Sequence, residues 1–282
     1  MGNPRTIQKI VFFLLGLCTI LIILPVFAIF FVILINGLPA ISFEFIFSPP
    51  RAGMISGGIF PAIIGTIYLI IGTAVFSLPI GILAAVYLSE YADDNWLTRL
   101  IDIAIINLAG VPSIVYGLFG LGLFVMFLNF GTSILSGSLT LSIMTLPVII
   151  TSTKEALNSV PKSFRDVSYS LGASRWQTVK NVVLPNAIPG IMTGTILGLS
   201  RAAGETAPIL FTVAAFYLPY LPRTIYDQVM VLPYHIYVLS TQVPNVPPKI
   251  QYGTVLVLVF IVFLLNITVA FIRSKFRKKK MW

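Results

Sequence analysis

Six long apolar runs restrict the fold of this chain more than any other feature of its sequence. They cover residues 10–35, 59–88, 103–127, 135–153, 187–216 and 254–272. Each is close to or above the roughly 20 residues that a helix needs to cross the hydrocarbon core of a bilayer. Only 10% of the 282 residues are charged, whereas a soluble domain carries about 25%. We therefore expect an all-α, polytopic membrane protein with six transmembrane helices.

The basic residues predict the orientation of these helices. With the N-terminus inside, the cytoplasmic segments hold fourteen Lys and Arg residues and the outer segments hold three, Arg51, Arg223 and Lys249. Cytoplasmic loops of membrane proteins carry the excess of Lys and Arg. We therefore expect a multi-pass protein of the cell (inner) membrane with both termini in the cytoplasm. The net charge of +9 then belongs to the membrane flanks, and nucleic acid is not expected as a partner.

The sequence lacks the residues for disulfides, for cysteine metal clusters and for ATP binding. Cys18 is the only cysteine, and it lies within the first apolar run, so a disulfide framework or a cysteine metal cluster is excluded. The sequence has no Gly-x4-Gly-Lys-Ser/Thr loop that could cradle the phosphates of ATP. We expect no catalytic residue, no metal and no cofactor bound by this chain. The first run is too long for a cleavable signal peptide and is expected to remain as an anchor.

Prolines lie within or near the second to fifth runs, at Pro79, Pro112, Pro147 and Pro208. In lipid, such breaks persist where neighbouring helices or a wet cavity satisfy the freed carbonyls. They indicate either a bundle packed around a pathway or kinks that only improve packing. The first run lacks small residues over most of its length, so we expect it to be peripheral to a core of the other five.

Small residues form a stripe along the fifth run. Gly190, Gly194, Gly198 and Ala202 recur every four residues. Residues at this spacing lie on one face of a helix, and small ones let another backbone approach closely. The stripe therefore predicts a tight helix–helix contact.

The fifth run also holds two charged residues, Arg201 and Glu205, one turn apart on the seam of Gly194 and Gly198. Arg201 follows the start of the run by about 21 Å of helix, past the middle of the membrane. A charge there costs at least a few kcal/mol and indicates a functional site. The planar guanidinium matches the oxygens of carboxylate and phosphate. The pair either receives an oxyanion or is a buried bridge that only fixes helix register.

An amphipathic segment leads into the fifth run. Residues 164–172 are helix-like, and Gly172 offers the left-handed conformation that ends a helix. Ser174 and Gln177 then have the spacing of a capping box for a second short helix. That helix continues into apolar residues, so the pair resembles a device that couples a water-exposed segment to a membrane helix.

The same segment carries the signature of a known family. Permeases of binding-protein-dependent ABC importers have a cytoplasmic motif of Glu-Ala-Ala, three residues, Gly, nine residues, Ile, one residue and Leu-Pro. This chain follows that spacing with Asp166-Val167-Ser168, Gly172, Val182 and Leu184-Pro185. The replacements keep chemical character, and the chain resembles this family. The resemblance implies a MetI-like ABC type-1 permease bundle.

More narrowly, the chain resembles the PstA-type permeases of phosphate importers, over roughly 57–272. The stretches that carry this likeness are 57–66, 107–117, 171–178 and 201–208. It implies a permease subunit, not an enzyme, that moves inorganic phosphate inward. The implied partners are a PstC-like permease in a heterodimer, a PstB-like ATPase dimer that binds ATP and Mg, and a PstS-like phosphate-binding protein.

The resemblance assigns roles to residues of this chain. Arg201 and Glu205 match the family's charged pair implicated in phosphate passage, and Thr206 is grouped with them in the substrate pathway. Coupling to the ATPase is expected to involve Asp166, Gly172, Arg175, Trp176, Leu184 and Pro185. Arg175 and Trp176 are the expected anchors, because Arg and Trp dominate interface hot spots. Trp176 is alternatively a membrane-interface anchor.

The chain is expected to divide into a peripheral helix and outer loop (1–57), a permease core (58–272) and a basic cytoplasmic tail (273–282). The outer loop 217–252 holds six prolines, and its middle, 226–239, is a candidate for a short helix lying at the membrane interface. It is a plausible dock for the solute-binding protein, and its lone His235 is expected to be structural. Alternatives for the whole chain are an ABC permease for sulfate or molybdate, or an ATP-independent anion transporter or channel.

Overall fold

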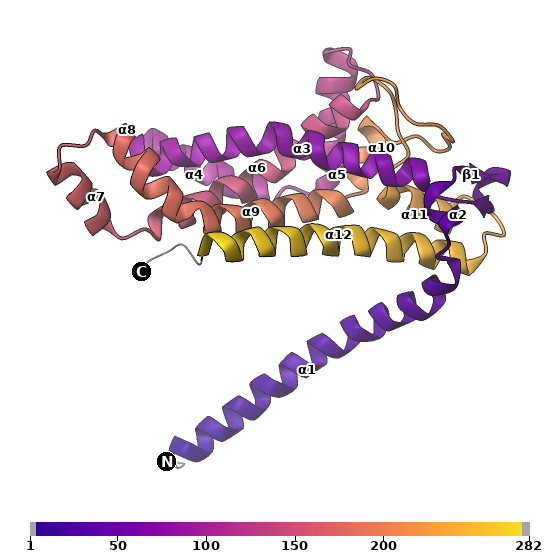
Figure 1. The fold of residues 1–282 in the computed structure, drawn as a ribbon, viewed down its shortest axis with the longest axis horizontal. Coiled ribbons are helices and arrows are strands. Elements are labelled where there is room, and N and C mark those ends of the chain that lie inside the picture. Colours follow the sequence, from indigo (N-terminus) through magenta and orange to yellow (C-terminus); the bar gives the residue numbers. More distant parts are fainter. Residues whose placement is uncertain (1–3, 278–282) are drawn as a thin grey trace.

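The computed structural model describes residues 4–277 and is built almost entirely of helices (Figure 1). The long helices are α1 (Pro4–Gly37), α3 (Phe60–Val86), α6 (Ile134–Asn158), α9 (Leu184–Gly204) and α12 (Pro248–Arg277). The shorter ones are α2 (Phe43–Phe47), α4 (Trp96–Ala109), α5 (Ser113–Gly120), α7 (Lys162–Ser170), α8 (Arg175–Thr178), α10 (Ala207–Thr212) and α11 (Leu232–Thr241). Lys278, Lys279 and Lys280 of the predicted basic tail lie outside the described residues.

Three π turns and a small ribbon complete the fold. The π turns are Tyr87–Tyr91, Leu121–Phe127 and Val179–Val183. Short 3-10 turns form at Leu38–Ala40 and Ala52–Met54. Strands β1 (Pro50–Arg51) and β2 (Ser56–Gly57) pair antiparallel, with Arg51 opposite Ser56.

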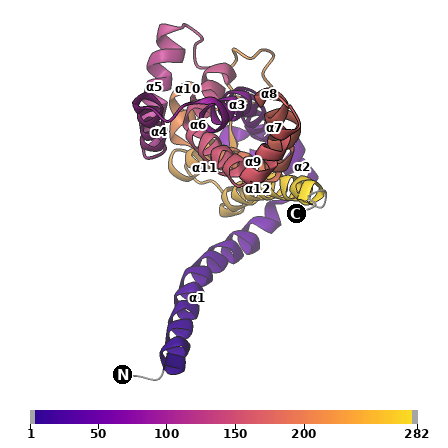
Figure 2. The ribbon, with the colours of Figure 1, turned by 90° about the vertical axis from the view of Figure 1, so that its left-hand side faces the viewer.

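Helices α3, α6, α9 and α12 run side by side and form the body of the molecule (Figures 1 and 2). Helix α6 packs against both α3 and α9 and is the most buried of these spans. Polar groups join α6 to α3, since the Ser142 hydroxyl lies 3.1 Å from the carbonyl oxygen of Thr73. Lipid provides no hydrophobic drive between helices, so small residues and such hydrogen bonds hold a bundle of this kind together.

Helix α1 diverges from this body (Figures 1 and 2). Its apolar side chains are exposed along most of its length. It meets the bundle only at its C-terminal end, within the described residues, where Gly37 packs on the backbone of Tyr252 at the start of α12. A Cβ atom at Gly37 would lie 2.8 Å from the Tyr252 carbonyl oxygen, so only glycine allows this approach.

The third apolar run is not one straight helix, which corrects the predicted span 103–127. Helix α4 begins earlier, at Trp96, and α5 follows it at a bend of 103°. Pro112 accounts for the break, because proline lacks an N–H and disfavours helical angles at the residue before it. Of the described helices, five are long and apolar enough to cross a membrane, or six if this bent pair forms one span.

The predicted fifth span, 187–216, is wrong in its C-terminal part. Helix α8, the π turn Val179–Val183 and α9 form one helical segment of 30 residues, which ends at Gly204. Helix α10 is separate, and Pro208 lies in its first turn, where the missing N–H costs nothing. Pro189 is the proline inside α9.

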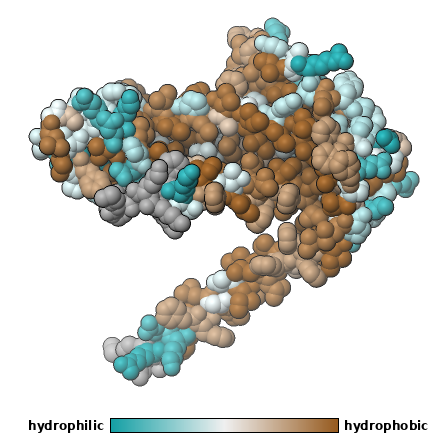
Figure 3. Space-filling view, in the orientation of Figure 1, coloured by the Kyte–Doolittle hydropathy of each residue, from teal (hydrophilic) through white to brown (hydrophobic). Residues whose placement is uncertain are grey.

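The hydropathy of the surface agrees with a chain that crosses a membrane several times. Apolar residues cover the middle of the bundle and most of α1, and hydrophilic residues gather toward the two ends of the bundle (Figure 3). The predicted fold class, an all-α polytopic membrane protein, is confirmed. We refer to the two ends as the α7 end and the α11 end.

Candidate functional site

The charged pair predicted in the fifth run lies where α9 ends. Arg201 occupies the last turn of α9, and its Nε atom is 3.2 Å from Oε1 of Glu205. A cation here complements the negative end of the helix dipole. Glu205 has already left the helix, with a ψ angle of 135°, and its side chain reaches back. The pair therefore spans the break between α9 and α10.

The two partners differ in exposure. The Glu205 side chain is 16% exposed and lines a small cavity with residues of α3, α6 and α10, including Thr66, Leu141 and Ile209. The Arg201 side chain is 42% exposed, so the described residues leave part of it uncovered. The contact with Glu205 uses the Nε atom of Arg201. A guanidinium has further N–H donors, which could bind an oxyanion. Thr206, the third predicted pathway residue, directly precedes α10.

The glycine stripe of α9 faces α6. A Cβ atom at Gly190 would meet Ala156, one at Gly194 would collide with Ser152, and Gly198 lies against Ile149. These contacts are those of two helices held at close range, as the spacing of small residues predicts. Helix α9 is thus fixed against α6 from Gly190 to Gly198, over about two turns, before it reaches Arg201.

The two helices before α9 form as predicted. Gly172 has a φ angle of +80°, in the left-handed region, and ends α7. The Ser174 hydroxyl accepts from the backbone N–H of Gln177 at 3.3 Å, and the Gln177 side chain accepts from the Ser174 N–H at 2.8 Å. The predicted left-handed turn and capping box are therefore confirmed.

Helix α8 passes into α9 through the π turn Val179–Val183 rather than through a hinge. Pro185 has no N–H to donate to the carbonyl of Asn181, and a wider turn just before it relieves the clash with its ring. Leu184 is half-buried and Pro185 is exposed. The predicted coupling residues Leu184 and Pro185 thus lie inside one continuous helical segment.

Large apolar side chains stand exposed at the α7 end. Leu171 is 83% exposed and Trp176 is 58% exposed, and Val167 is also exposed. We call these three residues the α7–α8 surface. The expected anchor Arg175 lies beside it, with its guanidinium carbon 5.3 Å from the centre of the Tyr91 ring, and Asp166 is exposed nearby. Large apolar side chains exposed together at a hydrophilic end of the molecule are candidates for an interaction site.

A buried ion pair that sequence reasoning missed ties α7 to the bundle. Arg165 of α7 binds Glu90, in the π turn that follows α3. The acidic residues near 90–102 are visible in the sequence, but nothing there shows which base meets which acid. Asp102 of α4 similarly pairs with Lys154 of α6.

Comparison with known proteins now identifies the family. Residues 77–281 match the family described as "Binding-protein-dependent transport system inner membrane component". The chain belongs to this family of ABC transporter permeases. The expected MetI-like fold of this permease is confirmed by the family and by its structural neighbours.

Curated relatives match most of this permease. It is 35% identical to "Probable ABC transporter permease protein YqgI" of Bacillus subtilis, over 98% of each chain. It is also 35% identical to "Probable phosphate transport system permease protein PstA" of Methanocaldococcus jannaschii, over 90% of this chain and 89% of that one. The resemblance to PstA-type permeases is thereby confirmed.

A solved structure shares the fold. The crystal structure of a bacterial ABC transporter involved in the import of the acidic polysaccharide alginate contains a chain that superimposes with a TM-score of 0.65. The match covers 98% of this permease and 97% of that chain, at 16% identity. At that identity the match shows the fold alone.

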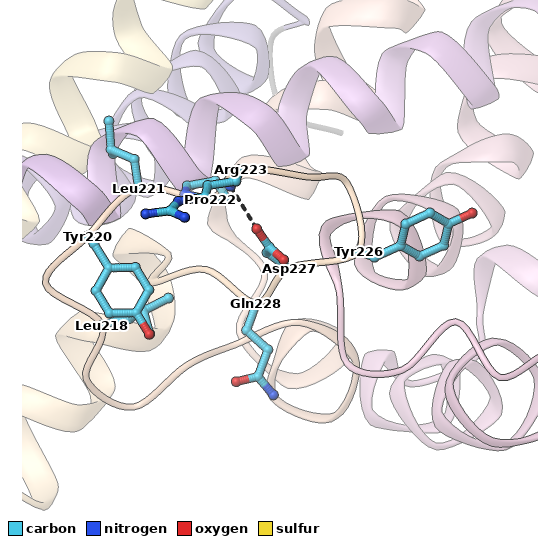
Figure 4. Close-up of a pocket in the computed structure, with 8 residues that line it drawn as sticks. All are labelled: Leu218, Tyr220, Leu221, Pro222, Arg223, Tyr226, Asp227 and Gln228. Atoms are coloured by element: carbon cyan, nitrogen blue, oxygen red, sulfur yellow. Dashed lines mark hydrogen bonds between the residues drawn. The ribbon is translucent and has the colours of Figure 1, made fainter.

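The α11 end of this permease carries an open cavity of about 950 Å³, formed by the loop between α10 and α11 (Figure 4). Asp227 lies in it and accepts from the backbone N–H groups of Arg223, at 2.7 Å, and Thr224, at 2.9 Å. These hydrogen bonds lower the pKa of the Asp227 carboxyl. Tyr220 and Tyr226 flank the cavity on opposite sides (Figure 4).

The short helix predicted at 226–239 is α11, which begins further along the chain, at Leu232. One of its faces is buried against the bundle rather than lying open at a membrane interface. His235 is buried in it, and no described residue hydrogen-bonds to its Nδ1 atom. Burial lowers the pKa of His235 to about 4. Across the described residues, no three His, Cys, Asp or Glu side chains are grouped to hold a metal ion.

Proposed function

We propose that this chain is the permease subunit of an ATP-driven ABC importer that moves inorganic phosphate inward across the cytoplasmic membrane. The observation that carries the proposal is the Arg201–Glu205 pair at the break between α9 and α10. Discontinuous helices hold substrate sites in many transporters. An arginine fork matches the oxygens of phosphate. A relative at 35% identity, the M. jannaschii protein, is named as a phosphate permease.

In this proposal the α7 end faces the cytoplasm, with both termini on that side. Lys154, Lys162, Arg165, Arg175 and Lys180 all belong to the α7 end or the helix ends beside it. The positive-inside rule places such a concentration of basic residues in the cytoplasm. The loop between α10 and α11 then faces outward.

The α7–α8 surface is then the dock for a PstB-like ATPase dimer. In this proposal ATP and Mg bind to the ATPase and not to this chain. Leu171 and Trp176 are too exposed to serve the fold of this chain, and they have the character of interface anchors. Because α8 continues into α9, a displacement of α8 reaches Arg201 along one helix. Asp166, Gly172 and Arg175 complete the coupling segment.

In the same proposal, the exposed part of the Arg201 side chain faces a PstC-like permease, the second subunit of a heterodimer. Phosphate passes between the two subunits, with its oxygens held by the guanidinium while Glu205 and Thr206 shape the inner side of the path. A PstS-like binding protein delivers phosphate at the α11 end, where the loop cavity with Tyr220 and Tyr226 is open.

Sulfate and molybdate are the alternative assignments of the substrate, because the arginine fork alone can bind any oxyanion of this shape. An ATP-independent transporter or channel is disfavoured, because the α7–α8 surface would have no partner to cover it.

The decisive experiment reconstitutes the complex of this chain with its ATPase, sister permease and binding protein in liposomes. We expect uptake of radiolabelled phosphate that requires ATP and the binding protein. Excess unlabelled phosphate should compete, while sulfate and molybdate should not. Competition by sulfate or molybdate alone would assign the other oxyanion, and uptake without ATP would contradict the ABC importer.

A further inference from the structure

Arg165 connects α7 to two membrane helices at once. Its Nη2 atom lies 2.5 Å from Oε1 of Glu90, and its Nε atom lies 3.2 Å from Oε2. The same guanidinium donates to the carbonyl oxygens of Leu157, at 3.0 Å, and Val160, at 2.8 Å. Glu90 follows α3, and the two carbonyls lie at the C-terminal end of α6. One side chain of α7 therefore holds the ends of α3 and α6 together.

The pair is built as an interior feature rather than a surface ion pair. The side chain of Glu90 is 6% exposed and that of Arg165 is 15% exposed. Exposed ion pairs contribute little, whereas removing one partner of a buried pair leaves an uncompensated charge. The bidentate arrangement also fixes the angle between α7 and α3, because a guanidinium and a carboxylate meet in one plane.

Further contacts make α7, α8 and the end of α3 a single unit. The hydroxyl oxygens of Ser168 and Thr178 lie 2.8 Å apart in a buried contact between α7 and α8. Arg175 of α8 lies over the ring of Tyr91, next to Glu90. Apolar packing adds to these polar contacts, because Val179 and Val183 belong to one buried cluster with Val86 of α3 and Leu157 of α6.

We infer that Glu90 and Arg165 are positioning residues that make α3, α6 and α9 move as one body when the α7–α8 surface is displaced. The inference rests on the proposed function, because it assumes that an ATPase moves this surface. Glu205 lines a cavity with Thr66, Leu69 and Ile70 of α3. If α9 moved alone, Glu205 would slide against α3, whereas movement as one body carries the Arg201–Glu205 pair intact.

The first test measures coupling in the reconstituted complex, as phosphate transported per ATP hydrolysed. In Glu90→Gln and Arg165→Lys we expect this ratio to fall by about tenfold. ATP hydrolysis stimulated by the binding protein should stay within about twofold of the unaltered complex. A residue that only supported folding would lower assembly and both rates together. The double variant should be no worse than either single one, because the two residues act as a unit.

Asp102→Asn is the matched control. It removes the carboxylate of the other ion pair at the α7 end, between α4 and α6, which does not involve α7. Its transport per ATP should equal that of the unaltered complex. An unchanged ratio in Glu90→Gln and Arg165→Lys, or an equal fall in Asp102→Asn, would overturn the inference.

A second test does not depend on the substrate. In the detergent-solubilised permease, trypsin should cleave within residues 159–175 several-fold faster in Glu90→Gln than in the unaltered protein, because α7 is released from α3 and α6. The Asp102→Asn control should be cleaved at the original rate. An unchanged rate in Glu90→Gln would overturn the inference by itself. Failure of the proposed function would appear separately, as an unaltered complex that imports no phosphate.

Discussion

The hydroxyl oxygens of Ser168 in α7 and Thr178 in α8 lie 2.8 Å apart, and both side chains are buried. This contact crosses the turn at Gly172, so it fixes the angle between the two helices of the coupling segment. The turn itself is short and the φ angle of Gly172 is +80°. The hydrogen bond and the glycine together define one geometry for the α7–α8 surface.

We expect Thr178→Val to destabilise this segment. Valine keeps the shape of threonine but leaves the Ser168 hydroxyl buried without its partner, which costs about 1–3 kcal/mol. The double variant Ser168→Ala, Thr178→Val removes both hydroxyls and should recover much of the loss. The midpoint of thermal denaturation of the purified permease measures both changes. Equal midpoints for Thr178→Val and the unaltered protein would show that the contact does not stabilise the fold.

Gly194→Ala should push α9 away from α6. A Cβ atom at this position collides with the Ser152 side chain, and overpacking of this kind costs about 1–3 kcal/mol. Gly204→Ala is the matched control, because no described atom lies within 4 Å of a Cβ atom there. We expect a lower denaturation midpoint for Gly194→Ala, and an unchanged or slightly higher one for the control. A Gly194→Ala midpoint equal to that of the control would refute the close contact.

Stability should fall as the pH falls from about 6.5 toward 4, because of His235. The folded permease holds this side chain neutral, with a pKa of about 4, whereas the unfolded chain protonates it near pH 6.5. The unfolded state therefore binds more protons in this window, and stability rises with pH through it. The contribution is complete above the unfolded pKa and is lost as the pH falls to the folded one.

His235→Leu tests this sign, because His235 is the only histidine in the sequence. Denaturation midpoints at pH 7.5 and 5.0 should differ less in the variant than in the unaltered permease. Between pH 7.5 and 5.0, the two proteins should differ by about 2 kcal/mol at most in the change of unfolding free energy. An identical pH dependence in both would show that His235 does not stay neutral in the fold.

The apolar runs and the coupling segment are predictable from sequence because each depends on local chemistry. The length of an apolar run can be compared directly with the thickness of the bilayer core. The Ser174–Gln177 spacing specifies a capping box from four consecutive residues alone. The 103° bend between α4 and α5 is harder to predict. Apolar residues continue on both sides of Pro112, and their hydropathy does not report a change in the direction of the helix axis. The end of α9 at Gly204 is hidden for the same reason, because α10 is as apolar as α9.

The Glu90–Arg165 pair could not be predicted from sequence for a different reason. Its partners are 75 residues apart in the sequence, and their meeting depends on how α3, α6 and α7 pack. The buried face of α11 likewise depends on contacts with α3 and α12 that no local pattern encodes. The Arg201–Glu205 pair could be predicted, because its two residues are separated by a single helical turn.

Arg201→Ala should abolish phosphate uptake while leaving the complex assembled. Alanine removes the guanidinium of this partly exposed side chain, so no fork remains for an oxyanion between the subunits. Arg201→Lys keeps the charge without the planar fork and should reduce uptake by about tenfold. Glu205→Gln should retain the shape of the site but release the guanidinium, and we expect tighter phosphate binding with slower passage.

Arg99→Ala is the matched control for the loss of Arg201. Arg99 also pairs with a nearby carboxylate, Asp94, at 2.9 Å, but both of these side chains are largely exposed. Exposed pairs contribute little, so uptake should stay within about twofold of the unaltered complex. Uptake in proteoliposomes, normalised to the amount of co-purified ATPase, separates passage from assembly. If Arg201→Ala transported phosphate as well as Arg99→Ala, the pair would only fix the end of α9, and the path would have to run elsewhere.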